Sequence, residues 1–180
     1  AGFYTFGLLK NDYRAQATAQ GMLESLALSG LYVQTIKRIT GRESPFIAKE
    51  NGNPGGNWNP FPSYPAYQKS TPHYDAVPSG HLATIMSGFT VITQNYPDVK
   101  WLKPVGYTAI GLLCFQMVQS QVHWTSDYPI ALIIGYFTGK NIAKNRYKVL
   151  NQSAENKKYK MEFVSGNFMG ITTAGINVKF

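Results

Sequence analysis

The chain has 180 residues, and its hydrophobic content of 44% is typical of a globular protein and excludes a disordered one. Lysine and arginine number 17 against 9 acidic residues, and the net charge of +8 favours nucleic acid, anionic lipid headgroups or small phosphorylated molecules as partners. Cys114 is the only cysteine, which excludes an intramolecular disulfide and a cysteine-based metal site. We expect its thiol to be buried and inert.

The first predicted element is a helix over residues 14–38, where apolar residues recur at spacings of three and four without a proline. Gly41 is expected to stop it. Residues 43–77 then hold six prolines and several aromatic side chains, and we interpret them as a long ordered loop. This loop either forms a lid over a pocket or only covers the surface, and the sequence leaves both open.

Three further helices are predicted over residues 80–95, 103–121 and from residue 128 or 129 to 146. Seven basic residues between Lys140 and Lys160 favour a solvated helix end over a nucleic-acid site, and no nucleic-acid partner is expected. The sequence therefore predicts an all-α fold, a helical bundle with the long ordered loop.

The last part of the chain has a different pattern, with spaced glycines and weak alternation in "GINVKF". We expect a short extended or β tail there. The chain is predicted to form a single domain over residues 1–180, with a core at 14–146 and a tail at 147–180. No apolar stretch reaches the length of a membrane span, and the missing initiator methionine suggests that an N-terminal segment has been removed.

Two of the three histidines lie in patterns that suggest chemistry. His81 ends the stretch "PSGH", where a predicted helix begins, and Asp127 follows His123 by four residues. A carboxylate at that spacing can fix the tautomer of an imidazole and leave its other nitrogen free to act as a base or nucleophile. Asp127 and Ser79 could equally be ordinary helix N-caps.

The start of the helix at residue 80 is also a candidate anion site. The main-chain N–H groups of Ser79, Gly80 and His81, together with the helix dipole, favour a bound anion. Lys37, at the end of the first helix, would add a positive charge. A phosphate could then lie between this turn and the ring of His123.

These motifs together resemble the type 2 phosphatidic-acid phosphatase superfamily, which includes class A acid phosphatases and vanadium haloperoxidases. Its pattern is Lys, six residues, Arg-Pro; then Pro-Ser-Gly-His; then Ser-Arg, five residues, His, three residues, Asp. Lys37 begins the first element, "PSGH" at 78–81 matches the second, and His123 with Asp127 match the third. The resemblance covers about residues 37–139.

The resemblance implies a helical bundle and a metal-independent phosphatase that acts through a phosphohistidine and needs no cofactor. His123 would attack phosphorus, Asp127 would orient its imidazole, and His81 would protonate the leaving oxygen. Lys37, Ser79 and the Gly80 amide would hold the phosphate oxygens. The substrate would be a phosphorylated small molecule, meaning a phosphomonoester, or a lipid phosphate.

Both arginines of the pattern are missing, because Ser44 and Met117 occupy their places. Arg42, two residues before Ser44, is the candidate replacement for phosphate binding. The alternative function is a catalytically impaired or inactive family member that binds an anionic or lipid-like ligand. A third possibility is altered chemistry on a less charged substrate, in a pocket that Gln116 and Met117 make more neutral. The expected location is the bacterial periplasm or a membrane face outside the cytoplasm; membrane-surface association and the oligomeric state are left open.

Overall fold

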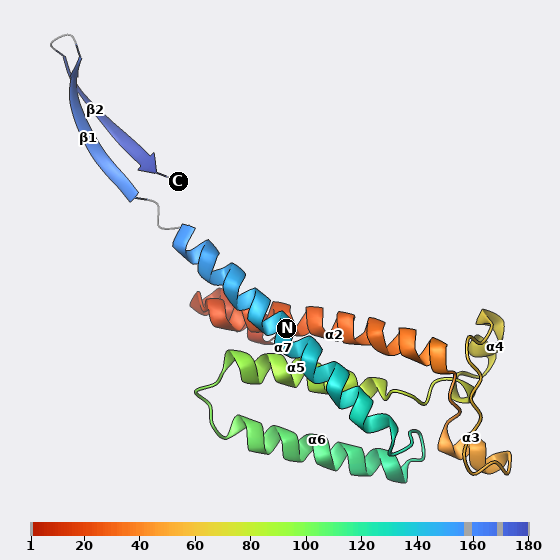
Figure 1. The fold of residues 1–180 in the computed structure, drawn as a ribbon. Coiled ribbons are helices and arrows are strands. Elements are labelled where there is room, and N and C mark those ends of the chain that lie inside the picture. Colours follow the sequence, from red (N-terminus) through yellow and green to blue (C-terminus); the bar gives the residue numbers. More distant parts are fainter. Residues whose placement is uncertain (1, 157–159, 169–170, 180) are drawn as a thin grey trace.

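Four long helices carry the fold in the computed structural model, which describes the backbone of residues 2–156, 160–168 and 171–179 and the side chains of residues 2–146. The helices are α2 (Tyr13–Thr40), α5 (Gly80–Asn95), α6 (Leu102–Gln119) and α7 (Asp127–Asn156) (Figure 1). Each matches a helix predicted from the sequence, and the all-α bundle is confirmed.

Both ends of α2 are fixed by the residues that flank it. The carboxylate of Asp12 accepts hydrogen bonds from the main-chain N–H groups of Arg14 and Ala15, which caps the start of the helix. Gly41 has φ 55° and its N–H donates to the carbonyl of Lys37 at 2.8 Å, so it ends the helix as predicted. A Cβ atom on Gly41 would lie 1.7 Å from the carbonyl oxygen of Asn59.

The centre of the bundle is α5, which packs against both α2 and α7. Two glycines of α7 allow the close approach: a Cβ on Gly135 would lie 2.4 Å from the carbonyl oxygen of Ala83, and one on Gly139 2.3 Å from that of Ser87. The core cluster contains Val33, Leu82, Ala83, Met86, Ile110, Met117, Tyr128 and Ala131. Helix α6 contributes only Ile110 and Met117 to the described core, so it lies against α5 through few side chains.

The structure also contains shorter helices that the sequence did not predict. Helix α1 (Gly2–Lys10) precedes α2, and the segment expected as a loop contains α3 (Pro45–Glu50), α4 (Tyr64–Lys69) and a 3-10 turn, η1 (Thr71–His73). The remainder of that segment is irregular but hydrogen-bonded, as expected of an ordered loop. Residues 45–73 lie at the end of the bundle where α2 stops (Figure 1).

The C-terminal part is an antiparallel hairpin of β1 (Lys160–Phe168) and β2 (Ile171–Lys179), paired from Lys160 with Lys179 to Phe168 with Ile171. The expected β tail is therefore present. Helix α7 continues ten residues beyond the predicted end at residue 146 and includes the basic run that we interpreted as a helix end. Part of the "ENKKYK" stretch lies outside the described residues.

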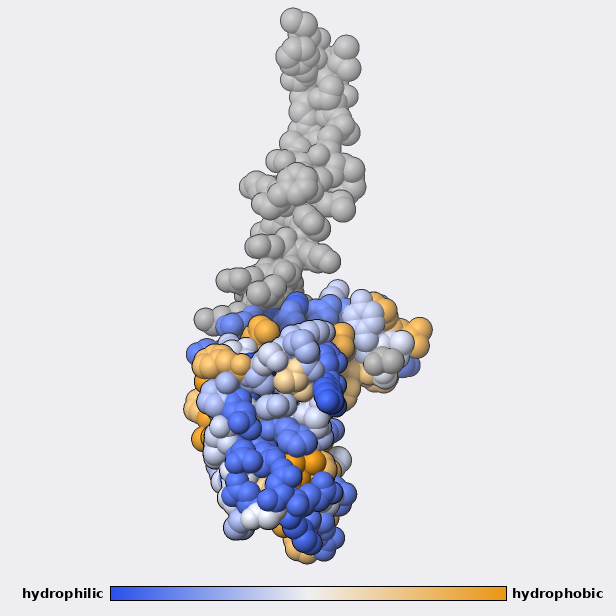
Figure 2. Space-filling view, turned by 90° about the vertical axis from the view of Figure 1, so that its right-hand side faces the viewer, coloured by the Kyte–Doolittle hydropathy of each residue, from blue (hydrophilic) through white to orange (hydrophobic). Residues whose placement is uncertain are grey.

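The surface at the α3 and α4 end is largely hydrophilic, and hydrophobic residues gather toward the edges of this view (Figure 2). Within the described residues, none of the helices combines the length and the apolar character that a membrane crossing requires. Cys114 is only partly buried, in contrast to the expected full burial, because it lies on the lightly packed α6; partial burial still raises the pKa of its thiol.

Candidate active site

A short segment after Gly41, residues 42–44, forms the backbone frame of the site. Arg42 makes an antiparallel bridge with Trp58 and a parallel bridge with Asp75, so the segment lies between two other parts of the chain. The N–H of Ala76 donates to the carbonyl of Arg42 at 2.9 Å. This pairing fixes the position of the chain that leads into α5.

His123 is buried in the link between α6 and α7, with 5% of its surface exposed. Its Nδ1 lies 2.6 Å from the carbonyl oxygen of Ala76. A carbonyl can only accept, so Nδ1 carries the proton and Nε2 of the neutral ring carries the lone pair. Burial lowers the pKa of His123, which keeps the ring neutral near pH 7. Nε2 therefore has the electronic state of a nucleophile.

Asp127 is fully buried at the start of α7. Its Oδ2 accepts a hydrogen bond from the main-chain N–H of Trp124 at 2.8 Å and lies 3.9 Å from Nδ1 of His123. Burial raises the pKa of this carboxyl to about 6, while the bond from Trp124 and the charge of Arg42 oppose the rise. Asp127 lies beside His123, but the direct acceptor that orients the ring is the Ala76 carbonyl.

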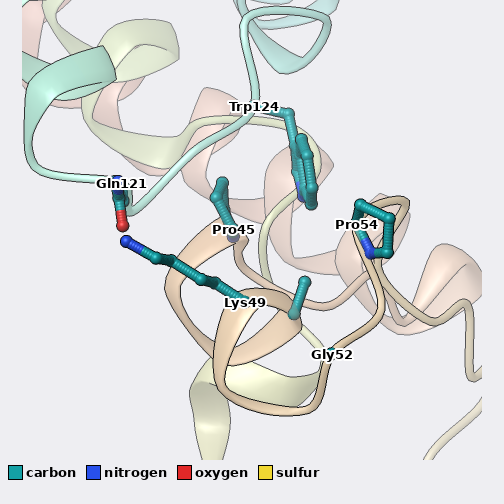
Figure 3. Close-up of a pocket in the computed structure, with 7 residues that line it drawn as sticks. Pro45, Lys49, Gly52, Pro54, Gln121 and Trp124 are labelled. Carbon is teal, nitrogen blue, oxygen red and sulfur yellow. The ribbon is translucent and has the colours of Figure 1, made fainter.

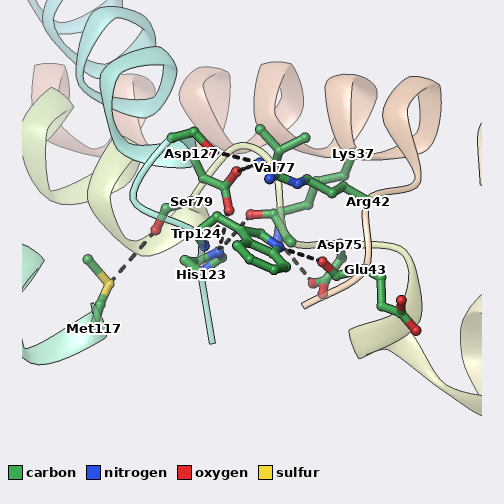
Figure 4. Close-up of polar contacts among 12 residues, drawn as sticks. Lys37, Arg42, Glu43, Asp75, Val77, Ser79, Met117, His123, Trp124 and Asp127 are labelled. Atoms are coloured by element: carbon green, nitrogen blue, oxygen red, sulfur yellow. Dashed lines mark hydrogen bonds and ion pairs between the residues drawn. The ribbon is translucent and has the colours of Figure 1, made fainter. Parts of the chain in front are cut away.

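Arg42 binds the carboxylate of Asp127 rather than an open space. Its Nη1 donates to Oδ1 of Asp127 at 2.6 Å and to the hydroxyl of Ser126 at 2.8 Å (Figure 4). Its guanidinium lies 4.9 Å from the ring centres of both Trp58 and Trp124. The residue proposed from the sequence as a phosphate ligand therefore lies over two indoles and is paired with Asp127.

Lys37 is also paired, although only 7% of its side chain is exposed. Its Nζ donates to Oδ2 of Asp75 at 3.0 Å. The field of Lys37 lowers the pKa of His123, and that of Asp75 raises it. Lys37 and Asp75 thus act on His123 with opposite signs.

The start of α5 brings Ser79, Gly80 and His81 to the same region. Ser79 is fully buried and occupies the N-cap position, but its hydroxyl does not cap the helix. The hydroxyl donates instead to the thioether sulfur of Met117 at 3.9 Å. The first-turn N–H groups therefore have no side-chain cap, which leaves them suited to an anion.

A cavity of about 230 Å³ brings the two histidines together. Its lining residues come from α5, α6 and the link after α6: His81, Ile85, Leu113, Gln116, Met117, Ser120, Val122 and His123. None of them belongs to residues 43–77, so the long segment is not a lid on this cavity. It positions Asp75 and Ala76 instead.

A second, larger cavity of about 390 Å³ is lined by Gln121 and Trp124 of this link and by residues of α3. Lys49 extends toward Gln121, and the indole of Trp124 stands near Pro54 (Figure 3). Pro45, Ala48 and Gly52 complete its lining. Among the described residues that line it, Lys49 is the only ionisable one, so these residues offer no acid–base pair.

Three residues of the site were missed by sequence reasoning. Asp75 and Ala76 come just before "PSGH", and the indole N–H of Trp124 donates to the carbonyl of Glu43 at 2.8 Å. Asp75 could have been noticed as an acidic residue three positions before Pro78. The Ala76 contact is made by main chain and leaves no side-chain signal.

Comparison with protein-family models finds the PAP2 superfamily, whose model matches residues 19–149. This range contains α5, α6, both histidines and most of α2 and α7. Searches of the curated proteins and of the solved structures gave no match. The family match therefore rests on the same part of the chain as the site.

Proposed function

The chain belongs to the PAP2 superfamily, whose members are generally phosphatases, and on this premise we propose that it hydrolyses a phosphomonoester or a lipid phosphate through a phosphohistidine. The observation that carries the proposal is the cavity shared by His81 and His123. A buried neutral imidazole with its Nδ1–H engaged is prepared to attack through Nε2.

In the first step Nε2 of His123 forms a bond to phosphorus as the bond from phosphorus to the leaving oxygen breaks. His81, which lines the same cavity, donates a proton to that oxygen. In the second step water attacks phosphorus, the phosphorus–nitrogen bond breaks, and the proton of the water returns to His81. Phosphate leaves and both histidines regain their starting states.

The charge on phosphorus oxygens is stabilised, in this proposal, by the first-turn N–H groups of α5, by Ser79 and by Lys37. The Ser79 hydroxyl would exchange its weak contact with Met117 for a phosphate oxygen. The ring of His123 acquires positive charge in the attack, and the Ala76 carbonyl and the carboxylate of Asp127 stabilise it.

The test is release of p-nitrophenol from p-nitrophenyl phosphate by the full chain. Replacement of the nucleophile, His123→Ala, is expected to lower kcat by roughly a thousandfold or more. His73→Ala is the matched control. His73 lies in η1, contacts the hydroxyl of Ser70 and is not among the residues that line the cavity of His81 and His123. Equal turnover by His123→Ala and the unmodified chain would refute the proposed mechanism.

A second candidate function is binding of an anionic or lipid-like ligand without turnover. The pairing of Lys37 with Asp75 and of Arg42 with Asp127 favours it, because the charge of each cation is already balanced by a carboxylate and stabilises a phosphate less. Calorimetry with phosphate and pyrophosphate separates the two candidates. Tight binding without hydrolysis of any phosphate ester supports the binding role, and turnover excludes it.

A further inference from the structure

The charges around His123 cancel one another. Lys37 lies 3.0 Å from the carboxylate of Asp75, and Arg42 lies 2.6 Å from that of Asp127. Among the described residues, these side chains and His81 are the ones whose charges act on His123 or Asp127. Two positive and two negative charges sum to zero, so these pairs supply no excess positive charge for a phosphate dianion. In the described part of the site the remaining positive charge is that of protonated His81, whose proton goes to the leaving oxygen.

The pairs cannot readily release their cations to a ligand. The side chains of Arg42 and Lys37 are 12% and 7% exposed, and the Asp127 side chain is fully buried. A ligand that withdrew Arg42 from Asp127 would leave a carboxylate buried without a partner, which is strongly unfavourable. Both ion pairs therefore stay formed when a ligand binds.

The wall of the cavity next to the phosphate position is apolar. Met117 places its sulfur 3.9 Å from the Ser79 hydroxyl, where a cationic side chain would have to stand to bind the same oxygen. Ile85, Leu113 and Val122 extend this wall. A volume of about 230 Å³ holds an aryl ring or a short alkyl chain, since cavities near 150 Å³ already bind benzene.

From this geometry we propose that the site selects phosphoryl groups with a single negative charge and an apolar ester substituent, such as alkyl or aryl phosphodiesters. The proposal rests on the phosphohistidine mechanism of the proposed function and changes the preferred substrate of that site from phosphomonoesters to phosphodiesters. One charge can be satisfied by the N–H groups of α5 and the Ser79 hydroxyl without breaking an ion pair. The apolar substituent lies between Ile85 and Met117.

The chemical step is the one already described, applied to a diester. Nε2 of His123 bonds to phosphorus, the bond to one ester oxygen breaks, and His81 gives that oxygen its proton. The second ester group stays on phosphorus in the intermediate. Water then releases a phosphomonoester, which carries two charges above its second pKa of about 6 and is no longer matched to the site.

The test compares two substrates with the same leaving group at pH 8, p-nitrophenyl phosphate and phenyl p-nitrophenyl phosphate. At this pH the first is a dianion and the second a monoanion. We expect kcat/KM for the diester to equal or exceed that for the monoester. A monoester preference of tenfold or more overturns the inference and leaves the proposed phosphatase function intact.

One substitution adds a positive charge, a second removes a negative charge, and a third serves as control. Met117→Arg adds a guanidinium beside Ser79, and Asp75→Asn frees Lys37 from its partner. Each is expected to shift the ratio of kcat/KM toward the monoester by roughly tenfold to a hundredfold. Met117→Leu keeps the volume and should leave the ratio unchanged. An unchanged ratio in both charged variants also overturns the inference.

Calorimetry with phosphonates keeps the inference testable without turnover. Benzylphosphonate at pH 9 is a dianion, and its monomethyl ester is a monoanion of similar shape. Tighter binding of the monoester supports the inference even if no ester is hydrolysed, a result that would contradict the proposed function alone. Tighter binding of the dianion, or binding of neither compound, overturns it.

Discussion

The two cavities that the link between α6 and α7 lines differ in size and in chemistry. The larger, about 390 Å³, contains Lys49 and the face of Trp124, whereas the smaller, about 230 Å³, contains His81 and His123. Volume alone would select the first. The second has a buried imidazole with a defined tautomer and a second histidine within the same walls, and these groups decide where chemistry can occur.

The largest expected effect separates the cavities directly. His81→Ala removes the proposed proton donor and should lower kcat by about a hundredfold to ten thousandfold, most strongly for substrates with a basic leaving group. Lys49→Ala alters only the larger cavity and should change kcat by less than about twofold. Steady-state kinetics with aryl and alkyl phosphates measures both effects. A larger loss of kcat in Lys49→Ala than in His81→Ala would place the chemistry in the larger cavity and contradict the account.

The next effect concerns the ion pair behind the smaller cavity. Arg42→Met leaves the buried carboxylate of Asp127 without its partner and should lower the free energy of unfolding by about 3 kcal/mol at pH 8. Without Arg42 the pKa of Asp127 rises further above its unfolded value. The folded state then holds its proton to higher pH, so stability decreases as pH rises through the folded pKa.

Urea unfolding at pH 5 and pH 8 measures this difference, and the loss should be smaller at pH 5, where Asp127 is protonated. Arg38→Met is the control, because Arg38 stacks over the ring of Tyr67 at 3.7 Å. Its loss should be about 1 kcal/mol or less at both pH values. Equal, pH-independent losses in the two variants would show that the pair with Asp127 is not formed.

The smallest effect is on the titration of His123. Burial places its pKa below 6.5, so the ring loses its proton at lower pH than an ordinary histidine. Lys37→Met removes a charge that lowers this pKa and should raise it, whereas Asp75→Asn should lower it, each by roughly one unit or less. NMR titration of the ring resonances, assigned with His73→Ala and His81→Ala, checks the two signs. Shifts of the same sign would contradict the arrangement of these charges.

The sequence predicted the four main helices because their limits are marked by local residues. Helix α5 has the predicted bounds. Gly41 ends α2 in a left-handed conformation, which glycine adopts readily because it has no side chain, so the end could be predicted from this one residue. Helices α3 and α4 were missed because prolines and glycines around short helices have the composition of a loop. Helix α1 was missed too, since its apolar residues show no clear helical face.

The sequence predicted which residues lie in the site better than it predicted their hydrogen-bond and ion-pair partners. The motifs pointed to His81, His123, Asp127 and Lys37, and the structure brings all four to one region. The partners could not be predicted, because Asp75 is 38 residues from Lys37 and the acceptor for His123 is a main-chain carbonyl. Arg42 was predicted to bind phosphate, and only the fold shows it bound to Asp127. The roles of these residues, the single-domain organisation and the extracytoplasmic location stay predictions.

The central claim is that His123 becomes the phosphorylated residue during turnover. Rapid quenching with p-nitrophenyl phosphate or its phenyl diester, followed by peptide mass spectrometry under alkaline conditions, locates the transferred group. We predict an acid-labile adduct on His123 that is absent from His123→Ala and accumulates when water attack is slow. Turnover with the group on another residue, or with no adduct on any histidine, would contradict the account.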